Sequence, residues 1–431
     1  MIFWILILST LLRLVSINQS LWLDESTTAI VSQMSLPSIF TAFLPYDFHP
    51  PLYYLVLNIW TNIFGASEIS LRMPSVIFGV LTIYITYKIG QTLWDRRTAL
   101  IASLLLATSG LHVYYSQEAR MYSLATFLAA LSIYFFLKNK WILFSITLLF
   151  LGMNDYVSLF VLPIFFIFSK DFKRLLLSIL PLLLSYISWL PIFLTQLTSG
   201  INISGTSWWN ILGTPTSKNI LLIPVKFILG RINLDDKSIY LILIVLVIGL
   251  FGYILSKSYK HTSKLIWLWL FIPIGIAFLV SFKIPTLLYF RFLFCLPAFY
   301  LLISFGLSNI KNNFKLFLAL VLFINLFSMS VYLLNPKFHR EDWRRAAKEI
   351  GHSLVIFPSN SQKESLKYYG KEEQIVYFEN FDGNEEEIWL SRYVWEIFDP
   401  QDLARKRIEE LGYNKTSEHN FNGVVLWKYT K

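Results

Sequence analysis

Two adjacent carboxylic acids, Asp24 and Glu25, directly follow the first apolar stretch of the chain, in the segment Leu21-Trp22-Leu23-Asp24-Glu25. Two carboxylates side by side at a membrane boundary repel each other and lose hydration, so such a pair usually marks a functional site. The structural alternative is a helix that begins here, with Asp24 as its N-cap and Glu25 in its first turn. Both roles are compatible, and the pair is the first candidate for chemistry.

A histidine and a third acid follow in the segment Asp47-Phe48-His49-Pro50-Pro51. Prolines at the first positions of a helix explain the Pro-Pro pair without any function. His49 comes just before that helix, so we expect its ring to face the acids. A lone histidine would be structural, and beside Asp47 a functional role is an equal alternative.

Three arginines, Arg72, Arg120 and Arg291, occur where apolar stretches begin or end. One alternative is that each side chain simply extends toward water; the other is that its guanidinium forms paired hydrogen bonds to a lipid phosphate. Glu118 and Tyr122 flank Arg120, although tyrosines are common at membrane boundaries. Cations beside acids fit the binding of an anionic lipid headgroup next to a nucleophile that must lose a proton.

Composition requires a membrane setting for most of the chain. Of the 431 residues, 55% are hydrophobic and only 15% are charged, too few for a water-soluble surface throughout. A helix needs about 20 apolar residues to cross a bilayer. We expect eleven spans, near residues 1–17, 73–93, 98–115, 122–137, 141–153, 156–168, 175–197, 238–256, 264–282, 291–308 and 315–334.

The segment 50–65 decides the topology. It is short and holds polar residues, so we predict a helix that lies in the membrane interface. With the N-terminus in the cytoplasm, the short inner loops then carry the basic residues, as the positive-inside rule requires. These are Arg96, Arg97, Lys138, Lys140, Lys170, Lys173, Arg174, Lys257, Lys260, Lys264, Lys311 and Lys315.

The chain divides into a membrane module, residues 1–336, whose first outer loop is 18–72, and a soluble extracytoplasmic α/β domain, residues 337–431. The domain has nearly balanced charge, so the net charge of +10 belongs to the membrane module and nucleic-acid binding is not expected. Helices are predicted at 341–351 and 402–412, and strands at 354–357, 374–378 and 424–429. The apolar stretch 220–229 is too short to span and is expected in the interface as a lid-like element.

Four motifs together resemble a known family. They are Leu-Trp-x-Asp-Glu from residue 21, His-Pro-Pro-Leu-Tyr-Tyr from residue 49, Phe-Gly-x-Ser-Glu-x-x-x-Arg-x-Pro-Ser from residue 64, and Tyr-Ser-Gln-Glu-x-Arg-x-Tyr from residue 115. They resemble the GT-C membrane glycosyltransferases. The narrower similarity is to family 39, the dolichyl-phosphate-mannose-protein mannosyltransferases and their bacterial relatives, which include aminoarabinose transferases. Segments at 291 and 338–347 resemble later motifs of the same group.

The resemblance implies an inverting transfer of a sugar, such as mannose or another hexose or pentose, from a polyprenyl-phosphate donor. The acceptor is a hydroxyl of a protein, lipid or glycan on the outer side of the cell membrane. By matching position, Asp24 is the general base, Glu25 its neighbour, and Arg72, Arg120 and Arg291 contact the donor phosphate. Asp47, His49, Glu118 and Tyr122 complete the expected site, although His49 stands where aminoarabinose transferases have a phosphate-binding lysine.

Two questions remain open from the sequence. A divalent cation is a possible cofactor, with Asp24, Glu118 and His49 as candidate ligands. The alternative function is a transporter, flippase, polymerase or ligase of lipid-linked sugars, and a transporter would more often show internal repeats and charges near the midplane.

Overall fold

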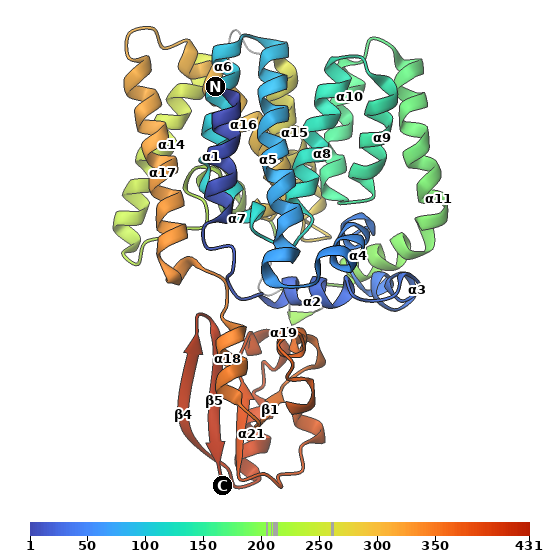
Figure 1. Ribbon diagram of the computed structural model, residues 1–431, viewed down its shortest axis with the longest axis vertical. Coiled ribbons are helices and arrows are strands. Elements are labelled where there is room, and N and C mark those ends of the chain that lie inside the picture. The colour runs from blue at the N-terminus through green and yellow to red at the C-terminus, as the bar shows by residue number, and fades with distance from the viewer. Residues whose placement is uncertain (204–205, 208, 210–213, 260–262) are drawn as a thin grey trace.

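The computed structural model describes residues 1–203, 206–207, 209, 214–259 and 263–431. It consists of a helical bundle and a smaller α/β domain stacked along the longest axis (Figure 1). The N-terminus lies at the end of the bundle that is remote from this domain, and the first outer loop lies between the two.

Several helices of the described residues are long and apolar enough to cross a membrane. They are α5 (Glu68–Leu93), α11 (Phe172–Asn202), α14 (Lys237–Ser258), the segment Tyr289–Ser308 that ends in α16 (Leu296–Ser308), and α17 (Phe314–Leu334). Shorter apolar helices complete the bundle: α1 (Ile2–Leu14), α8 (Tyr122–Leu137), α9 (Trp141–Gly152), η3 and α10 (Val157–Phe168), and α15 (Lys264–Val280). Each predicted stretch coincides with a helix or a consecutive pair, while the number that spans the membrane stays a prediction.

The bundle has central helices and lipid-facing ones. In the most apolar 18-residue stretch of each helix, the buried share is 83% for Tyr289–Ser308 and 61% for α5, but only 28% for α11 and 17% for α14. The exposed positions of α11 and α14 are mainly Leu, Ile and Val. Soluble proteins rarely expose apolar surface of this extent. These helices therefore contact lipid, and the chain is a multi-pass membrane protein.

The expected continuous span at 98–115 is broken. It consists of α6 (Arg96–Ala107) and α7 (Gly110–Ser116), which meet at 62°. A break frees backbone carbonyls that lipid cannot satisfy. Buried side chains of other helices take their place: Arg13 Nη1 donates to the carbonyl of Ala107 (3.3 Å) and Asn325 Nδ2 to that of Leu105 (2.9 Å). The hydropathy of this stretch contains no sign of the break.

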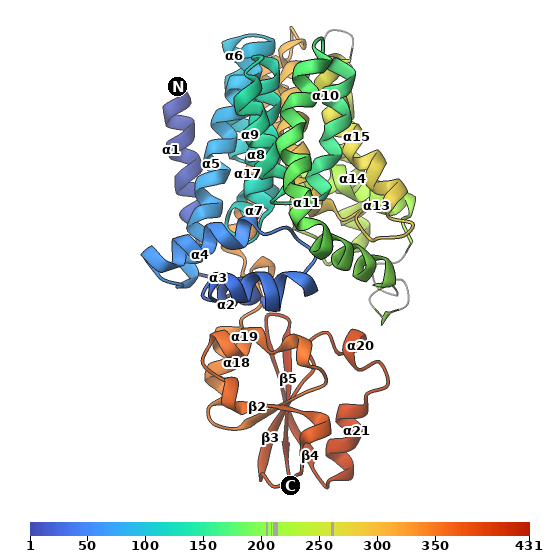
Figure 2. The same ribbon diagram turned by 90° about the vertical axis from the view of Figure 1, so that its right-hand side faces the viewer.

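The first outer loop forms a shelf across the end of the bundle that faces the α/β domain (Figure 2). It contains α2 (Leu23–Val31), α3 (Leu36–Ser38) and α4 (Leu52–Phe64). One side of α4 is buried through Tyr53, Tyr54 and Leu57, and the other exposes apolar residues, Ile59, Ile63 and Phe64. This two-sided helix agrees with an interfacial position.

The stretch expected as a second interfacial element is instead packed into the bundle. Helix α13 (Ser217–Leu229) buries Ile223 and the run from Phe227 to Leu229, against α7 and α17. Its sequence is apolar on more than one side, which favours burial over the interface. Part of the surrounding loop, at 204–205, 208 and 210–213, lies outside the described residues.

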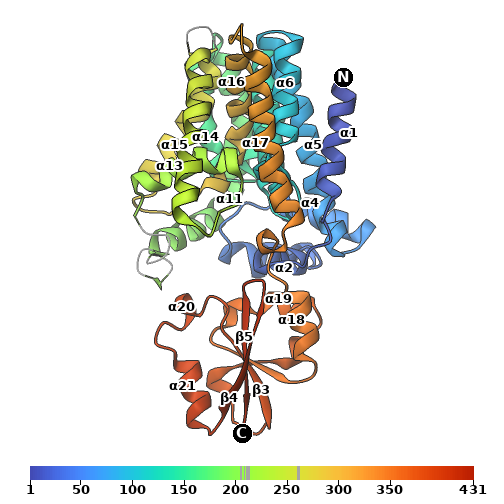
Figure 3. The same cartoon turned by 90° about the vertical axis from the view of Figure 1, so that its left-hand side faces the viewer.

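The predicted basic loops share one end of the bundle. The turns after α5, α8, α10 and α16 lie at the end that holds the N-terminus (Figures 1 and 3), and Lys260 lies outside the described residues. The shelf and the α/β domain are at the opposite end. The positive-inside rule then makes the shelf side extracytoplasmic, an orientation that remains our expectation.

The C-terminal domain is a five-stranded sheet with helices on both faces (Figure 2). The strand order is β2-β1-β3-β5-β4, with β1 (Leu354–Phe357), β2 (Ile375–Tyr377) and β3 (Glu387–Ser391) parallel, and β5 (Val424–Thr430) and β4 (Asn414–Phe421) antiparallel. One face packs on α18 (Trp343–Ile350) and α19 (Glu364–Tyr368), and the other on α21 (Leu403–Glu410). Strands β3 and β4 had no prediction from the sequence.

The expected orientation can be tested by cysteine labelling, because the native Cys295 is fully buried and gives little background. A Glu373→Cys variant in the α/β domain should react with a membrane-impermeant maleimide in intact cells. A Lys140→Cys variant, in the turn after α8, should react only after the cells are lysed. The reverse labelling pattern would show that the α/β domain is cytoplasmic, opposite to our expectation.

Candidate functional site

The two adjacent acids lie in the first turn of α2 and point in different directions. The N-cap of α2 is Trp22, so the interpretation of Asp24 as the cap is wrong, although acids in the first turn are still favoured by the helix dipole. The Asp24 side chain is 42% exposed, whereas that of Glu25 is completely buried. The pair therefore divides into one accessible and one inaccessible carboxylate.

Glu25 forms a buried, two-pronged ion pair with Arg72 of α5. Arg72 Nε lies 2.8 Å from Glu25 Oε1 and Nη2 lies 2.5 Å from Oε2. The other N–H groups of Arg72 donate to the carbonyls of Ile17, Gln19 and Ser20 at 2.6–3.0 Å. All five donors of the guanidinium are thus used. In this conformation Arg72 holds the start of the shelf and is closed to a phosphate, so its predicted phosphate contact would require this pair to open.

A second arginine reaches Glu25 from the segment that leads into the α/β domain. The Arg340 side chain is 1% exposed, and its Nε lies 3.4 Å from Glu25 Oε2. Its Nη2 lies 3.5 Å from Glu118 Oε2 and donates to the carbonyl of Tyr114 at 3.2 Å. Arg340 thereby joins two carboxylates from separate parts of the membrane module, a role that sequence reasoning missed.

Glu118 belongs to this inner cluster, and not to a pair with Arg120 as its spacing suggested. It is 1% exposed, and its Oε1 has no hydrogen-bond partner among the described residues. Burial raises the pKa of Glu118 to about 7, against the opposing effect of Arg340. For Glu25, burial is outweighed by Arg72 and Arg340, which bring its pKa below the ordinary value. The two buried carboxyls therefore differ in their affinity for a proton.

Arg120 is the partner of the accessible acid. Its Nη2 lies 3.6 Å from Asp24 Oδ2, and its Nη1 donates to Thr28 Oγ1 at 3.3 Å. Its Nε is buried and has no hydrogen-bond partner in the described part of the chain. Orphaned buried donors are costly, so this guanidinium still has capacity for an anionic ligand.

His49 pairs with the nearest acid on the shelf. Its Nδ1 lies 3.3 Å from Asp47 Oδ2, which also accepts a hydrogen bond from Tyr54 at 2.8 Å. Burial would raise the pKa of Asp47, but the charge of His49 and these hydrogen bonds lower it to about 2. Among the expected acids, the His49 ring therefore contacts Asp47.

Arg291 lies in the short helix that precedes α16 and is partly exposed. Its charge acts on Tyr122 together with that of Arg120, and on Asp155 together with that of His49. The segment that holds Arg291 packs beside Tyr122, because the Phe290 and Tyr122 ring centroids lie 5.4 Å apart. Arg120 and Arg291 therefore lie outside the inner cluster, to which Arg72 belongs.

The site has two layers. The inner cluster consists of Glu25, Arg72, Glu118 and Arg340 and is closed to solvent. The outer group consists of Asp24, Asp47, His49, Arg120, Tyr122 and Arg291. Arg340 was the main omission. Its signal was the segment His339-Arg340-Glu341-Asp342-Trp343, which resembled a family motif but had no assigned role.

The predicted metal ligands do not meet. Within the described residues no group of three His, Cys, Asp or Glu side chains is arranged to hold a metal ion. Asp24 pairs with Arg120, His49 with Asp47, and Glu118 with Arg340. Guanidinium groups compete with a cation for carboxylates, so these residues do not fit a metal and no catalytic step is derived through one.

The sequence matches a family model over part of the membrane module. The family described as dolichyl-phosphate-mannose-protein mannosyltransferase matches residues 48–198, which confirms the expected resemblance over that segment. An uncharacterized protein of Aquifex aeolicus is 26% identical over 137 residues, which are 31% of this chain and 27% of that relative. The chain thus aligns with about a quarter of the length of this relative.

Solved structures extend the similarity to the whole fold. ArnT from Cupriavidus metallidurans bound to undecaprenyl phosphate has a TM-score of 0.62 at 11% identity, with 98% of this chain and 96% of that chain covered. The chain has the GT-C fold. In the apo state of ArnT the TM-score is 0.63 at 11% identity, and the coverage is 99% and 97%. The Archaeoglobus fulgidus oligosaccharyltransferase in complex with Zn and sulfate has a TM-score of 0.54 at 13% identity, with 98% of this chain and 72% of that chain covered.

The raised pKa of Glu118 predicts a pH-dependent stability. Because its folded-state pKa of about 7 lies above the ordinary 4.5, the stability that its proton contributes is complete below about pH 4.5 and lost as the pH rises through about 7. A Glu118→Gln variant cannot ionise at this position. Between about pH 5 and pH 8 its free energy of unfolding should therefore rise relative to that of the wild type, by at most roughly 3 kcal/mol. The measurement is the unfolding midpoint of both proteins at each pH.

The matched control is Glu373→Gln, which removes an exposed carboxylate and should show no such trend. An equal difference between wild type and Glu118→Gln at both pH values would contradict the assigned ionisation of Glu118.

Proposed function

We propose that the protein is an inverting glycosyltransferase that moves a sugar from a polyprenyl-phosphate donor to an acceptor hydroxyl on the extracytoplasmic side of the cell membrane. The GT-C fold and the family match over residues 48–198 support the reaction class. The observation that carries the proposal is the division of Asp24 and Glu25 into an accessible and a buried carboxylate. A protein, lipid or glycan can supply the acceptor hydroxyl.

In the proposed reaction Asp24 is the general base. Its carboxylate takes the proton of the acceptor hydroxyl while the hydroxyl oxygen attacks C1 of the sugar. The bond from C1 to the phosphate oxygen breaks on the opposite face, which inverts the anomeric centre. The electron pair of that bond leaves with polyprenyl phosphate, so no separate general acid is needed.

The leaving phosphate gains negative charge as the bond breaks, and fixed cations lower the barrier for this step. We propose Arg120 and Arg291 for this role, because the charges of both act at Tyr122, beside which Phe290 packs, and the buried Nε of Arg120 has no hydrogen-bond partner among the described residues. We propose that Arg72 does not contact the donor and instead orients Glu25. His49 and Asp47 are proposed to line the same space from α4's side of the shelf.

An Asp24→Asn variant should lose at least about 100-fold in transfer rate, since removing a general base costs 10²–10⁴-fold. The assay follows label from a radiolabelled polyprenyl-phosphate hexose into acceptor or water, with purified protein in lipid. Binding of undecaprenyl phosphate should stay within a few-fold of the wild type, because the amide replaces only the base.

The control is Asp382→Asn, at an exposed position of the α/β domain, which should transfer normally. Full activity of Asp24→Asn would exclude Asp24 as the general base. Wild-type protein that binds the donor and carries it across a vesicle membrane without releasing sugar would favour a flippase instead.

A further inference from the structure

Two charged residues, Arg340 and Glu341, lie in the segment that connects the bundle to the α/β domain. We infer that Arg340 and Glu341 are positioning residues of the active site, so that the α/β domain supplies part of the catalytic centre. The inference rests on the proposed function, since it assigns Asp24 and Glu25 of α2 to that centre. Neither residue is expected to contact the donor.

Arg340 approaches Glu25 at Oε2, the carboxylate oxygen that also binds Arg72 Nη2. Glu25 Oε1 accepts a hydrogen bond from the Ala119 N–H at 2.8 Å, and Oε2 faces Arg340 Nε. Arg340 is itself held by neighbouring groups: its guanidinium lies over the Tyr114 ring at 4.5 Å, and its Nη1 donates to Tyr332 Oη at 3.3 Å. A change at Arg340 therefore moves Glu25 and, through the helix, Asp24.

Glu341 holds the other side of the same helical turn. Its carboxylate accepts hydrogen bonds from Tyr393 Oη at 3.0 Å and from Trp343 Nε1 at 3.3 Å, and it lies near the backbone N–H of Leu23, the first residue of α2. A carboxylate at the first N–H groups of a helix satisfies donors that the helix itself leaves unpaired. The negative charge of Asp24 acts on Glu341, which places the two acids near each other.

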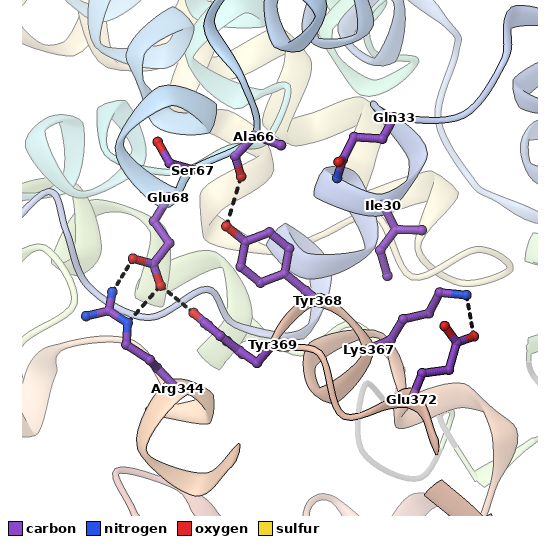
Figure 4. A pocket seen from close by; sticks show the side chains of 10 residues that line it. All are labelled: Ile30, Gln33, Ala66, Ser67, Glu68, Arg344, Lys367, Tyr368, Tyr369 and Glu372. Carbon is purple, nitrogen blue, oxygen red and sulfur yellow. Dashed lines mark hydrogen bonds and ion pairs between the residues drawn. The ribbon is translucent and has the colours of Figure 1, made fainter. Parts of the chain in front are cut away.

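The α/β domain is anchored strongly enough to fix these positions. Figure 4 shows Glu68, at the start of α5, between Arg344 and Tyr369 of the domain. Arg344 Nε lies 3.0 Å from Glu68 Oε1, and Tyr369 Oη donates to the same carboxylate at 2.5 Å. Tyr368 Oη donates to the carbonyl of Ala66 at 2.9 Å. A groove of about 690 Å³ lies along this contact, and α19 packs directly on α2.

The test uses full-length protein in lipid and separates rate from binding. Arg340→Ala should lower kcat by at least about 100-fold, the size expected when a reacting group is displaced by about 1 Å. Its Kd for undecaprenyl phosphate should stay within about threefold of the wild type. Arg340→Lys keeps the charge but not the forked geometry, so it should recover part of the lost kcat. Glu341→Gln should lower kcat with the same unchanged Kd.

The matched control is Arg345→Ala. Arg345 lies five residues further along the chain, in α18, and its side chain is exposed, so the kcat of Arg345→Ala should be unchanged. A kcat of Arg340→Ala within threefold of the wild type would overturn the inference. So would a parallel loss of undecaprenyl phosphate binding, which would make Arg340 a binding or purely structural residue. If Arg340→Ala does not fold, a wild-type kcat of Arg340→Lys overturns it.

Hydrogen exchange at the Ala119 amide gives a readout that does not need activity. This amide is held by Glu25, so its exchange should accelerate in Arg340→Ala but not in Arg345→Ala. If wild-type protein transfers no sugar, the proposed function fails while this measurement still decides the positioning. Unchanged protection of Ala119 in Arg340→Ala would overturn the positioning itself.

Discussion

Two fully buried carboxyl groups that pair with arginines organise the end of the bundle that faces the α/β domain. Isolated charges are very costly away from water, and removing one partner of a buried ion pair costs about 3–5 kcal/mol. Glu25 and Glu118 therefore require Arg72 and Arg340. These four residues come from α2, from the start of α5, from the turn after α7 and from the segment before α18. Their pairing fixes four chain segments relative to one another in a way that apolar packing, which lacks direction, would not.

The same cluster explains how neighbouring acids acquire different properties. Glu25 is neutralised inside the protein, and its neighbour Asp24 stays 42% exposed beside Arg120. One helical turn thus supplies both an anchor and an accessible carboxylate. The outer pair of Asp24 and Arg120 is looser, with 3.6 Å between Oδ2 and Nη2 and a partly exposed carboxylate. The buried pair of Glu25 and Arg72 thus holds the helix in place. The weaker pair of Asp24 and Arg120 can be exchanged for contacts with a ligand.

Much of the fold followed from hydropathy and charge, because the bilayer imposes lengths and loop charges that single sequences reveal directly. The helix positions and the shelf helix α4 were predicted in this way. The break between α6 and α7 was not, since the polar groups that allow it, Arg13 and Asn325, come from distant helices. Strand β4 was missed because it is an edge strand with mostly polar residues, and it pairs only with β5. Within the site the residue types were predicted, but the pairings were not: Arg340 follows Glu25 by more than three hundred positions, and only the tertiary fold brings them together.

The place of Arg340 in the chain has a consequence for biosynthesis. Membrane helices are inserted in order as the ribosome makes them, and Arg340 follows the last of them, α17, which ends at Leu334. Until this residue emerges, Glu118 lacks its ion-pair partner and Glu25 has only Arg72. A nascent membrane module therefore carries an incomplete charge cluster until the chain has been made beyond Arg340. The cluster is completed only after α17 has been synthesised.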